Sequence, residues 1–443
     1  MSEYASPNSQ VPAIKVHELY LPKDHNAYLS KIQTFPKSTK EAYDTLFNKG
    51  RLGRSSLEDM RQLRDDQELF IPRTCHLEAA ENLVEIVADR YLHENPSSPD
   101  YYARVRHHAL AARVPSKIAP VGKAPVAGKC CIVAGPPGIG KAAFQREVIK
   151  RFSDKKFHEH WKVSDSLEYA QQLVYIEVPF SSNVDTLMHM MLKQIDAGSN
   201  GVTWQGAQGP AARSQLLKPR LFSSATTRAL GLVYVYGIDA SALSARGAIE
   251  SLDLLQQFAA FTGASVVCSS TYAIWNLLDG KLPSALKLGS GGIHRFDYIP
   301  LGPDWHTLVR AFLHRHKLRV VRENVDPQTE AQIPGLLQLR ELNISEVVQI
   351  VPTWFEVELM AKALGVPALL FDFLAELWTV MKRKPRNQDL IEEADLTEAS
   401  RRYMSSKRFV VGNLSLLLSK QTCSSKETMI FADWITPEQR AHL

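Results

Sequence analysis

Residues 135–143 read G-P-P-G-I-G-K-A-A, and this stretch decides the fold class of the chain. It follows the apolar run 130–134 (C-C-I-V-A) and leads into a helix-like segment at 144–152. The order strand, glycine loop, helix is the context that a phosphate-binding P-loop requires. Glycines let backbone N–H groups turn inward onto a phosphate, and the N-terminus of the following helix adds partial positive charge.

The loop predicts an ATP site with weakened Mg²⁺ binding. Lys141 is expected to reach the terminal phosphates, while Ala142 stands where a Ser or Thr hydroxyl normally helps to hold Mg²⁺. A glycine turn between a core strand and a helix is the plainer alternative. The residues predicted to contact the nucleotide here are Gly135, Pro136, Pro137, Gly138, Ile139, Gly140, Lys141, Ala142 and Ala143.

Composition is that of a globular protein with room for two or three domains. The chain has 443 residues, of which 45% are hydrophobic and 22% charged. No run is apolar for the length of a membrane helix, and the polar start lacks a signal core, so no membrane partner is expected. The five cysteines show no metal-ligand spacing and are expected to be reduced. The formal net charge of +5 permits contact with nucleic acid but does not argue for it.

Apolar runs and helical patterns alternate through the middle of the chain. Because strands that alternate with helices form parallel sheets, the sequence predicts an α/β core with helices on both faces. Expected strands are 129–134, 173–179, 232–238 and 264–268, and expected helices are 77–91, 142–152, 184–195, a stretch near Ala225, and 248–262.

Beyond Asp304 the spacing of apolar residues is helical, which predicts a separate all-α unit. Its expected helices are 308–317, 357–364, 367–381 and 396–404. The predicted domains are an N-terminal extension (1–66), a nucleotide-binding core (67–305), a helical lid (306–405) and a weakly patterned C-terminal tail (406–443).

The strand 232–238 ends in Asp239, which is the position of the Mg²⁺-binding aspartate in a P-loop ATPase. The next residue, Ala240, stands where such enzymes carry a glutamate that polarises the attacking water. A helix or loop cap is the alternative role for Asp239.

Two further positions complete the predicted site. The strand 264–268 runs into Ser270 and Thr271, either of which could contact the γ-phosphate, and Ser270 is taken as the nucleotide contact. Ser and Thr are also common loop residues after a strand. Arg295 is predicted to act as a finger that reaches the nucleotide of a neighbouring subunit, with a solvated arginine as the alternative.

Two basic clusters predict contact with double-stranded DNA, because Lys and Arg neutralise phosphates without reading sequence. A solvated helix face or loop is the alternative for each cluster. The predicted DNA contacts are Arg310, Arg315, Lys317 and Arg319 in the first cluster and Lys382, Arg383, Lys384 and Arg386 in the second.

The ordered set of motifs resembles the TnsC/TniB family of AAA+ regulators from Tn-seven-like bacterial transposons. The P-loop is followed by 173–179 (L-V-Y-I-E-V-P), the strand that ends in Asp239, and 244–248 (S-A-R-G-A). Residues 263–267 (G-A-S-V-V) and 270–273 (S-T-Y-A) come next, with 71–74 (I-P-R-T) upstream and Arg295-Phe296 downstream. The resemblance covers about residues 67–305, and only the P-loop is specific by itself.

The resemblance implies an AAA+ P-loop core with a helical lid, located in the bacterial cytoplasm. It implies a protein that binds ATP, assembles with itself as a ring or filament around target DNA, and connects a target-selector protein to a transposase. Lys141 and the loop would hold phosphates, Asp239 would help hold Mg²⁺, and Arg295 would be the finger.

The departures at Ala142 and Ala240 indicate degenerate or very slow hydrolysis. Two alternatives stay open: an active AAA+ ATPase that remodels a protein or DNA complex, and a pseudo-ATPase that serves as an interaction scaffold.

Overall fold

The computed structural model describes most of the predicted core and much of the helical unit. The described residues are 71–93, 103–104, 107–108, 126–153, 160–161, 170–171, 175–197, 214–279, 287–315, 319–320, 353–384 and 390–440. The N-terminal extension expected at 1–66 lies outside them.

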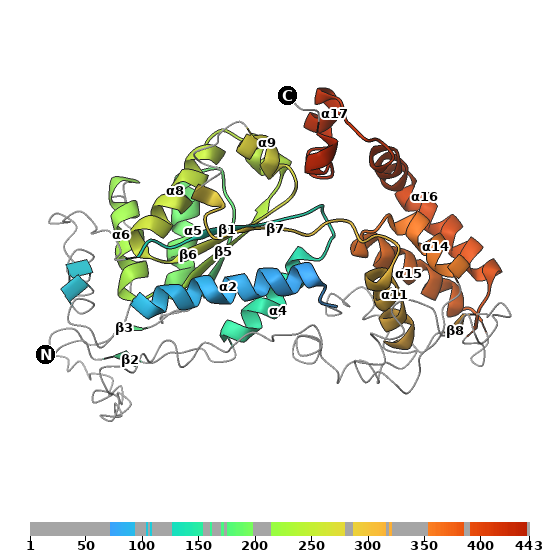
Figure 1. The fold of residues 1–443 in the computed structure, drawn as a ribbon, viewed down its shortest axis with the longest axis horizontal. Helices are drawn as coiled ribbons and strands as arrows, with labels where there is room; N and C mark the ends of the chain where they lie inside the picture. The colour runs from blue at the N-terminus through green and yellow to red at the C-terminus, as the bar shows by residue number, and fades with distance from the viewer. Residues whose placement is uncertain are drawn as a thin grey trace, which may run out of the picture.

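The core is a five-stranded sheet in which every pairing is parallel (Figure 1). Its order is β4-β5-β6-β1-β7, so the strand that carries the glycine loop has a neighbour on each side. The strands are β1 (Cys130–Ala134), β4 (Tyr175–Pro179), β5 (Leu232–Ile238), β6 (Ser265–Ser270) and β7 (Ile293–Arg295). All residues of β1 and β6 are buried, as expected for central strands of a parallel sheet.

Helices cover both faces of the sheet (Figure 1). On one face lie α2 (Thr74–His93) and α4 (Lys141–Ser153), and on the other α5 (Val184–Ala197), α6 (Ser214–Thr227) and α8 (Ala248–Thr262). Adjacent residues of β1 point to opposite faces, so Cys131 packs in the core with α2 and α4 while Cys130 packs with the other three helices. The α/β prediction is confirmed.

A helical unit lies at one end of the sheet, on the right of Figure 1. It contains α11 (Pro303–Arg315), α14 (Thr353–Ala363), α15 (Pro367–Met381) and α16 (Glu393–Leu418). Its core is aromatic, with Trp305, Phe312, Phe355, Phe373 and Tyr403 almost fully buried. The boundary expected between residues 405 and 406 falls inside α16, which runs without a break for 26 residues.

The C-terminal segment 419–440 turns back from α16 to the sheet. It contains α17 (Ser425–Ile430) and the short 3-10 helix η7 (Pro437–Gln439). Asp433 contacts residues at the ends of β5 and β6, so this part of the chain reaches the carboxyl edge of the sheet. The tail expected to be weakly patterned is therefore a defined structural element.

The remaining elements are short. Helices α7 (Ala240–Ser244) and α9 (Ile274–Asp279) follow β5 and β6. Two further pairs of two-residue strands are β2 (His160–Trp161) with β3 (Ala170–Gln171), and β8 (Arg319–Val320) with β9 (Leu390–Ile391).

Among the described residues, no single helix has the length and apolarity to cross a membrane. Helices α14 and α15 reach that length and apolarity only as a pair, and the chain bends by 118° between them.

Candidate functional site

The glycine loop leaves the carboxyl end of β1 and ends where α4 begins at Lys141. Gly138 and Gly140 have φ angles of +77° and +108°, in the region that residues with a Cβ rarely adopt. The N–H of Phe144 donates to the carbonyl of Gly140, which starts the helical hydrogen bonds. The sequence therefore folds here as the P-loop pattern predicts.

Lys141 lies within this loop, and its ammonium is held by the loop's own backbone. Its Nζ donates to the carbonyl oxygens of Gly135 (2.5 Å) and Pro136 (2.9 Å). Burial lowers the pKa of the Lys141 ammonium to about 8, while the negative charge of Asp433 opposes this shift. A phosphate in the loop would offer this buried cation a charged partner in place of two carbonyls.

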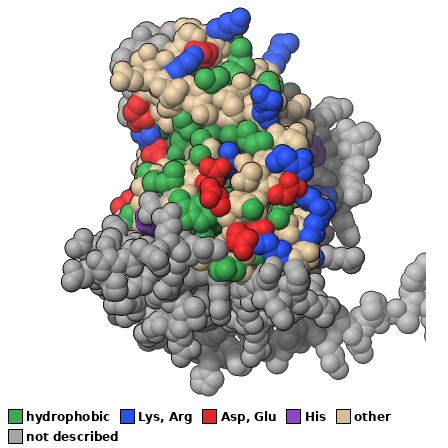
Figure 2. All heavy atoms as spheres, turned by 90° about the vertical axis from the view of Figure 1, so that its right-hand side faces the viewer, with side chains coloured by type: hydrophobic (Ala, Val, Ile, Leu, Met, Phe, Trp, Pro, Cys, Tyr) green, Lys and Arg blue, Asp and Glu red, His purple; other side chains and the backbone are tan. Residues whose placement is uncertain are grey.

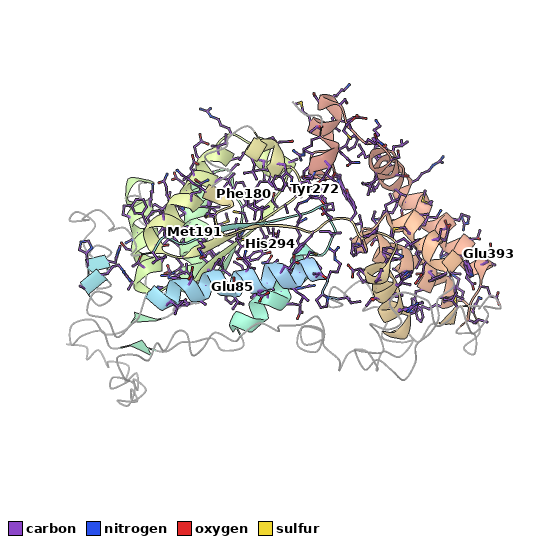
Figure 3. The ribbon with its side chains drawn as sticks, in the orientation of Figure 1. Glu85, Phe180, Met191, Tyr272, His294 and Glu393 are labelled. Atoms are coloured by element: carbon purple, nitrogen blue, oxygen red, sulfur yellow. The ribbon has the colours of Figure 1, made fainter. Side chains whose placement is uncertain are left out.

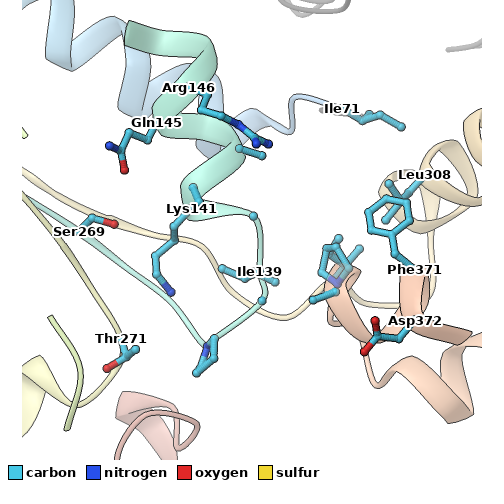
Figure 4. A pocket seen from close by; sticks show the side chains of 18 of the residues that line it. Ile71, Ile139, Lys141, Gln145, Arg146, Ser269, Thr271, Leu308, Phe371 and Asp372 are labelled. Atoms are coloured by element: carbon cyan, nitrogen blue, oxygen red, sulfur yellow. The ribbon is translucent and has the colours of Figure 1, made fainter. Parts of the chain in front are cut away.

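A cavity of about 950 Å³ opens beside the loop, between the strand ends and the helical unit (Figure 4). Lys141 and Thr271 lie on its polar side, and Ile71, Leu308 and Phe371 lie on the other side of the loop. This volume is that of a small-molecule site, and the side of Leu308 and Phe371 also carries the carboxylate of Asp372.

The N-terminus of α15 packs directly on the glycine loop. The N–H of Ala368 donates to the carbonyl of Gly138 at 3.1 Å. A Cβ placed on Gly138 would lie 2.7 Å from the Cβ of Ala368, closer than real side chains approach. The helical unit and the phosphate loop are therefore in contact, and this contact requires glycine at residue 138.

Asp239 borders the cavity at the end of β5. Its Oδ1 accepts a hydrogen bond from the N–H of Ala242 at 2.8 Å, so the residue caps helix α7. The cap that the sequence allowed as an alternative is present. Capping uses one carboxylate oxygen and leaves the position of Asp239 beside the cavity unchanged.

At the end of β6, Thr271 rather than Ser270 presents its hydroxyl to a group outside the strand backbone. The Ser270 Oγ is 2.9 Å from the carbonyl oxygens of both Ile238 and Thr271, and the residue is fully buried. The Thr271 hydroxyl donates to Asp433. Ser270 also lines the cavity, and because its hydroxyl is bonded to backbone carbonyls, its role as the nucleotide contact stays a prediction.

Arg295 lies on β7, paired in register with Ala134 at the end of β1. Its guanidinium forms a two-pronged ion pair with Glu438 and a further ion pair with Asp297 at 3.0 Å. The hydrogen bond that Arg295 donates to Glu438 is the main cause that raises the pKa of Arg295. The side chain is one-third exposed and held within the chain, which the sequence did not indicate.

Asp433 is the site residue that sequence reasoning missed. Its Oδ1 accepts from the N–H of Ala240 at 2.8 Å and from the hydroxyl of Thr271. It lies 193 residues from Ala240 along the chain, so no local motif could reveal the contact.

Of the first predicted DNA cluster, the structure describes the side chain of Arg310 alone. Arg310 is only 5% exposed on α11, and burial lowers the pKa of its guanidinium while the charge of Glu356 opposes the shift. The prediction for Arg310 is corrected: it is on the face of α11 that also buries Trp305 and Val309. Lys317 and the side chains of Arg315 and Arg319 lie outside the described residues.

The second cluster is partly available. Lys382 and Arg383 are exposed just after α15. Lys384 forms ion pairs with Asp395 and, at 3.6 Å, with Glu392, and Arg386 lies outside the described residues. On the face of the molecule in Figure 2, Lys and Arg side chains are interspersed with Asp and Glu rather than gathered in one patch.

The part of the chain that the structure describes contains no group of three or more His, Cys, Asp or Glu side chains that could hold a metal ion.

No family model matches the chain, and no curated protein matches it. Two solved structures that resemble it are a Walker-type ATPase of Pyrococcus abyssi and the ORC1 protein of Aeropyrum pernix in complex with DNA. The first is 14% identical, covers 73% of this chain and 77% of its own, and has a TM-score of 0.35. The second is 14% identical, covers 79% of each chain, and has a TM-score of 0.36.

These likenesses are distant, so the fold assignment depends on the chain itself. A parallel sheet of order β4-β5-β6-β1-β7, a glycine loop on β1 and a helical unit that contacts the loop make up an α/β P-loop core with a helical region.

Proposed function

We propose that this protein is a nucleotide-binding AAA+ regulator of DNA transposition. It binds ATP, assembles as a ring or filament on double-stranded target DNA, and connects a target-selector protein to a transposase. The observation that carries nucleotide binding is the loop at 135–143, with Lys141 at its end, opening into the cavity beneath α15. The role in transposition is supported by the ordered motifs of the core, from 71–74 to Arg295.

The residues fit a nucleotide at both ends of the cavity. Backbone N–H groups of the loop and the Lys141 ammonium would hold the phosphates. Asp239 would hold Mg²⁺ through water, and apolar Leu308 and Phe371 would receive the base.

Hydrolysis is slow in this proposal, because Ala142 brings no hydroxyl to the metal and Ala240 brings no carboxylate to the water. Nucleotide then acts mainly by stabilising the assembly. DNA contact is assigned to the exposed Lys382 and Arg383.

Titration of the purified chain with a fluorescent ATP analogue tests the nucleotide binding on which the proposal depends. Lys141→Ala removes the only full positive charge in the loop and should abolish binding. Lys129→Ala is the matched control, because Lys129 precedes β1 and pairs with Asp89 on the surface. Equal affinity of the wild type and Lys141→Ala for the ATP analogue would contradict the assignment of residues 135–143 as a phosphate-binding loop.

Phosphate release, measured with and without duplex DNA, tests the slow hydrolysis. Turnover within the ordinary enzyme range of ~1–100 s⁻¹ would favour the active-remodeller alternative. The regulatory role is tested by an integration assay with a transposase encoded beside this gene, where insertion that does not require this protein would contradict it.

A further inference from the structure

The C-terminal segment reaches the carboxyl edge of the sheet near the glycine loop, where the charge of Asp433 acts on the Lys141 ammonium. It contacts the end of β5 through Asp433 and Ala240, and the end of β6 through Asp433 and Thr271. In Figure 4, Thr271 lies at the polar side of the cavity, on the same side as the Lys141 ammonium. A carboxylate from a distant part of the sequence therefore stands between the two strand ends.

The position of Asp433 is set by two donors from different strands. The N–H of Ala240 and the Thr271 hydroxyl both donate to the same oxygen, Oδ1. These two hydrogen bonds fix Oδ1 in place and thereby orient the carboxylate. Ala240 is the residue at which P-loop ATPases place their water-polarising acid, and here its backbone holds an acid instead.

The segment is anchored on both sides of Asp433, so its placement does not depend on one contact. The Tyr298 hydroxyl donates to the carbonyl of Trp434 at 2.7 Å. Arg440 is 7% exposed and donates to the Asn276 side chain and the Tyr272 carbonyl, on the side of the core that faces α17 (Figure 3). A buried arginine with these partners fixes the segment firmly against the sheet.

We propose that Asp433 orients and deprotonates the attacking water in this site, in place of the acid that residue 240 lacks. The proposal depends on the nucleotide-binding function above. The water oxygen forms a bond to the γ-phosphorus, and the bond from that phosphorus to the bridging oxygen breaks. The electron pair leaves with ADP, and the proton of the water passes to the Asp433 carboxylate. ATP and water thus give ADP, phosphate and a proton.

The alternative role for these carboxylates is to block the site, and the two roles predict different effects on ATP affinity. Asp433 and Glu438 could act as stand-ins for phosphate, pairing electrostatically with Lys141 and Arg295 and blocking the site. A carboxylate that blocks phosphate lowers ATP affinity, so its removal raises affinity. A carboxylate that acts on water leaves ATP affinity almost unchanged and affects only the chemical step.

The experiment is single-turnover hydrolysis with the full chain in excess over radiolabelled ATP, for the wild type and Asp433→Asn. Asparagine keeps the shape and the Oδ1 acceptor but cannot take the proton. We expect Asp433→Asn to bind ATP and ADP with affinities within about threefold of those of the wild type. Its hydrolysis rate should fall by about 10²-fold or more. Met429→Ala is the control, because Met429 is 79% exposed on α17 in the same segment.

Relocation of the acid supplies a second variant. Ala240→Glu combined with Asp433→Asn should recover part of the lost rate, because it returns a carboxylate to the ordinary position. A third readout is binding of ADP with aluminium fluoride, which mimics the transferring phosphoryl group. We expect it to bind the wild type more tightly than ADP alone, and Asp433→Asn to lose that gain. Thermal melting checks that each variant is folded.

Several results would overturn the proposal. They are an unchanged hydrolysis rate in Asp433→Asn, a rise in its ATP affinity, or no phosphate release by a wild type that binds ATP. A wild type that does not bind ATP would instead contradict the proposed function itself, so the two failures are distinguishable.

Discussion

At the scale of single residues, the site combines a complete phosphate loop with an incomplete hydrolytic set. Lys141 is held by carbonyls of its own loop, Asp239 caps a helix at the cavity edge, and Ala142 has no hydroxyl. The lysine is buried enough for its charge to depend on pH near neutrality. Two predictions belong to this scale.

Nucleotide affinity should fall as pH rises above about 8. Burial lowers the pKa of the Lys141 ammonium to about 8 in the free protein, and bound phosphates favour the charged form, so binding requires the proton. One unit above this pKa only about a tenth of the lysine is charged, so affinity should drop about tenfold between pH 7 and pH 9. A fluorescent nucleotide analogue measures the change, and an affinity that stays level over this range would contradict the prediction.

Ala142→Thr should raise Mg²⁺-dependent turnover. Residue 142 is exposed at the start of α4, where a hydroxyl supplies one ligand to Mg²⁺. We expect an increase on the order of tenfold, corresponding to ~1.4 kcal/mol of transition-state stabilisation. Ala142→Val has the same shape without the hydroxyl and should leave turnover at the wild-type level. Equal effects of Thr and Val would show that packing, not metal binding, changes at this position.

At the scale of elements, some strands and helices begin and end where their patterns predict, whereas α16 extends well beyond the expected 396–404. β5, α8 and α15 match the expected bounds residue for residue. β7 was missed because it is a three-residue strand, Ile-His-Arg, at the edge of the sheet, too short to show alternation. The contact between α15 and the glycine loop also arises at this scale, because it joins two elements that are far apart in sequence.

Gly138→Ala should destabilise the protein and weaken nucleotide binding. A residue with a Cβ at φ +77° costs about 1–2 kcal/mol, and the added methyl would also meet Ala368 at 2.7 Å. Gly140→Ala is the matched control, since its φ is +108° but nothing lies within 4 Å of its added Cβ. Urea unfolding of both variants separates backbone strain from the clash.

Ala368→Gly in the Gly138→Ala background should restore the part of the stability that the clash removes. If Gly138→Ala and Gly140→Ala lose equal stability, and Ala368→Gly restores none of it, then α15 does not bear on the loop.

At the scale of the whole molecule, the sheet and the helical unit meet around one cavity, and the C-terminal segment contacts the strand ends beside it. The sheet supplies the phosphate loop and the helical unit supplies α15, while the C-terminal segment brings Asp433 to the strand ends and Glu438 to Arg295. For Arg295 to reach a neighbour's nucleotide, it must first leave Glu438. In the proposed assembly, release of Arg295 from Glu438 would couple subunit contact to the docking of the C-terminal segment.

Binding to duplex DNA should depend steeply on salt, vary little with sequence, and increase with a non-hydrolysable ATP analogue. Phosphate contacts carry no sequence information, and weak contacts from each subunit add up within an assembly. The double variant Lys382→Ala with Arg383→Ala should reduce the slope of log affinity against log salt concentration by the amount expected for about two phosphate contacts. Lys193→Ala, at an exposed position on α5, should leave this slope unchanged. Gel shifts over a salt series and size measurement check both points, and a monomer without salt-sensitive affinity would favour the scaffold alternative.

The sequence by itself determined the features that depend on neighbouring residues. Apolar runs of strand length, helical periodicity and the glycine pattern at 135–143 act through local backbone geometry, so the α/β core, the P-loop and the separate helical unit were predictable. The glycine pattern also identifies residue 142 as the position of the missing hydroxyl.

Tertiary structure alone decided which distant groups share the site. Arg310 looked like a surface cation because its helix is rich in basic residues, but packing turned it into the core. Glu438 contacts Arg295 although the two residues are 143 positions apart in the sequence, and Asp433 contacts Ala240 at a separation of 193 positions. Such contacts form because Arg440 is buried against Tyr272 and Asn276, while Ile435 packs on Leu417 and Cys423. That burial depends on the folded core, so the sequence around Asp433 does not predict it.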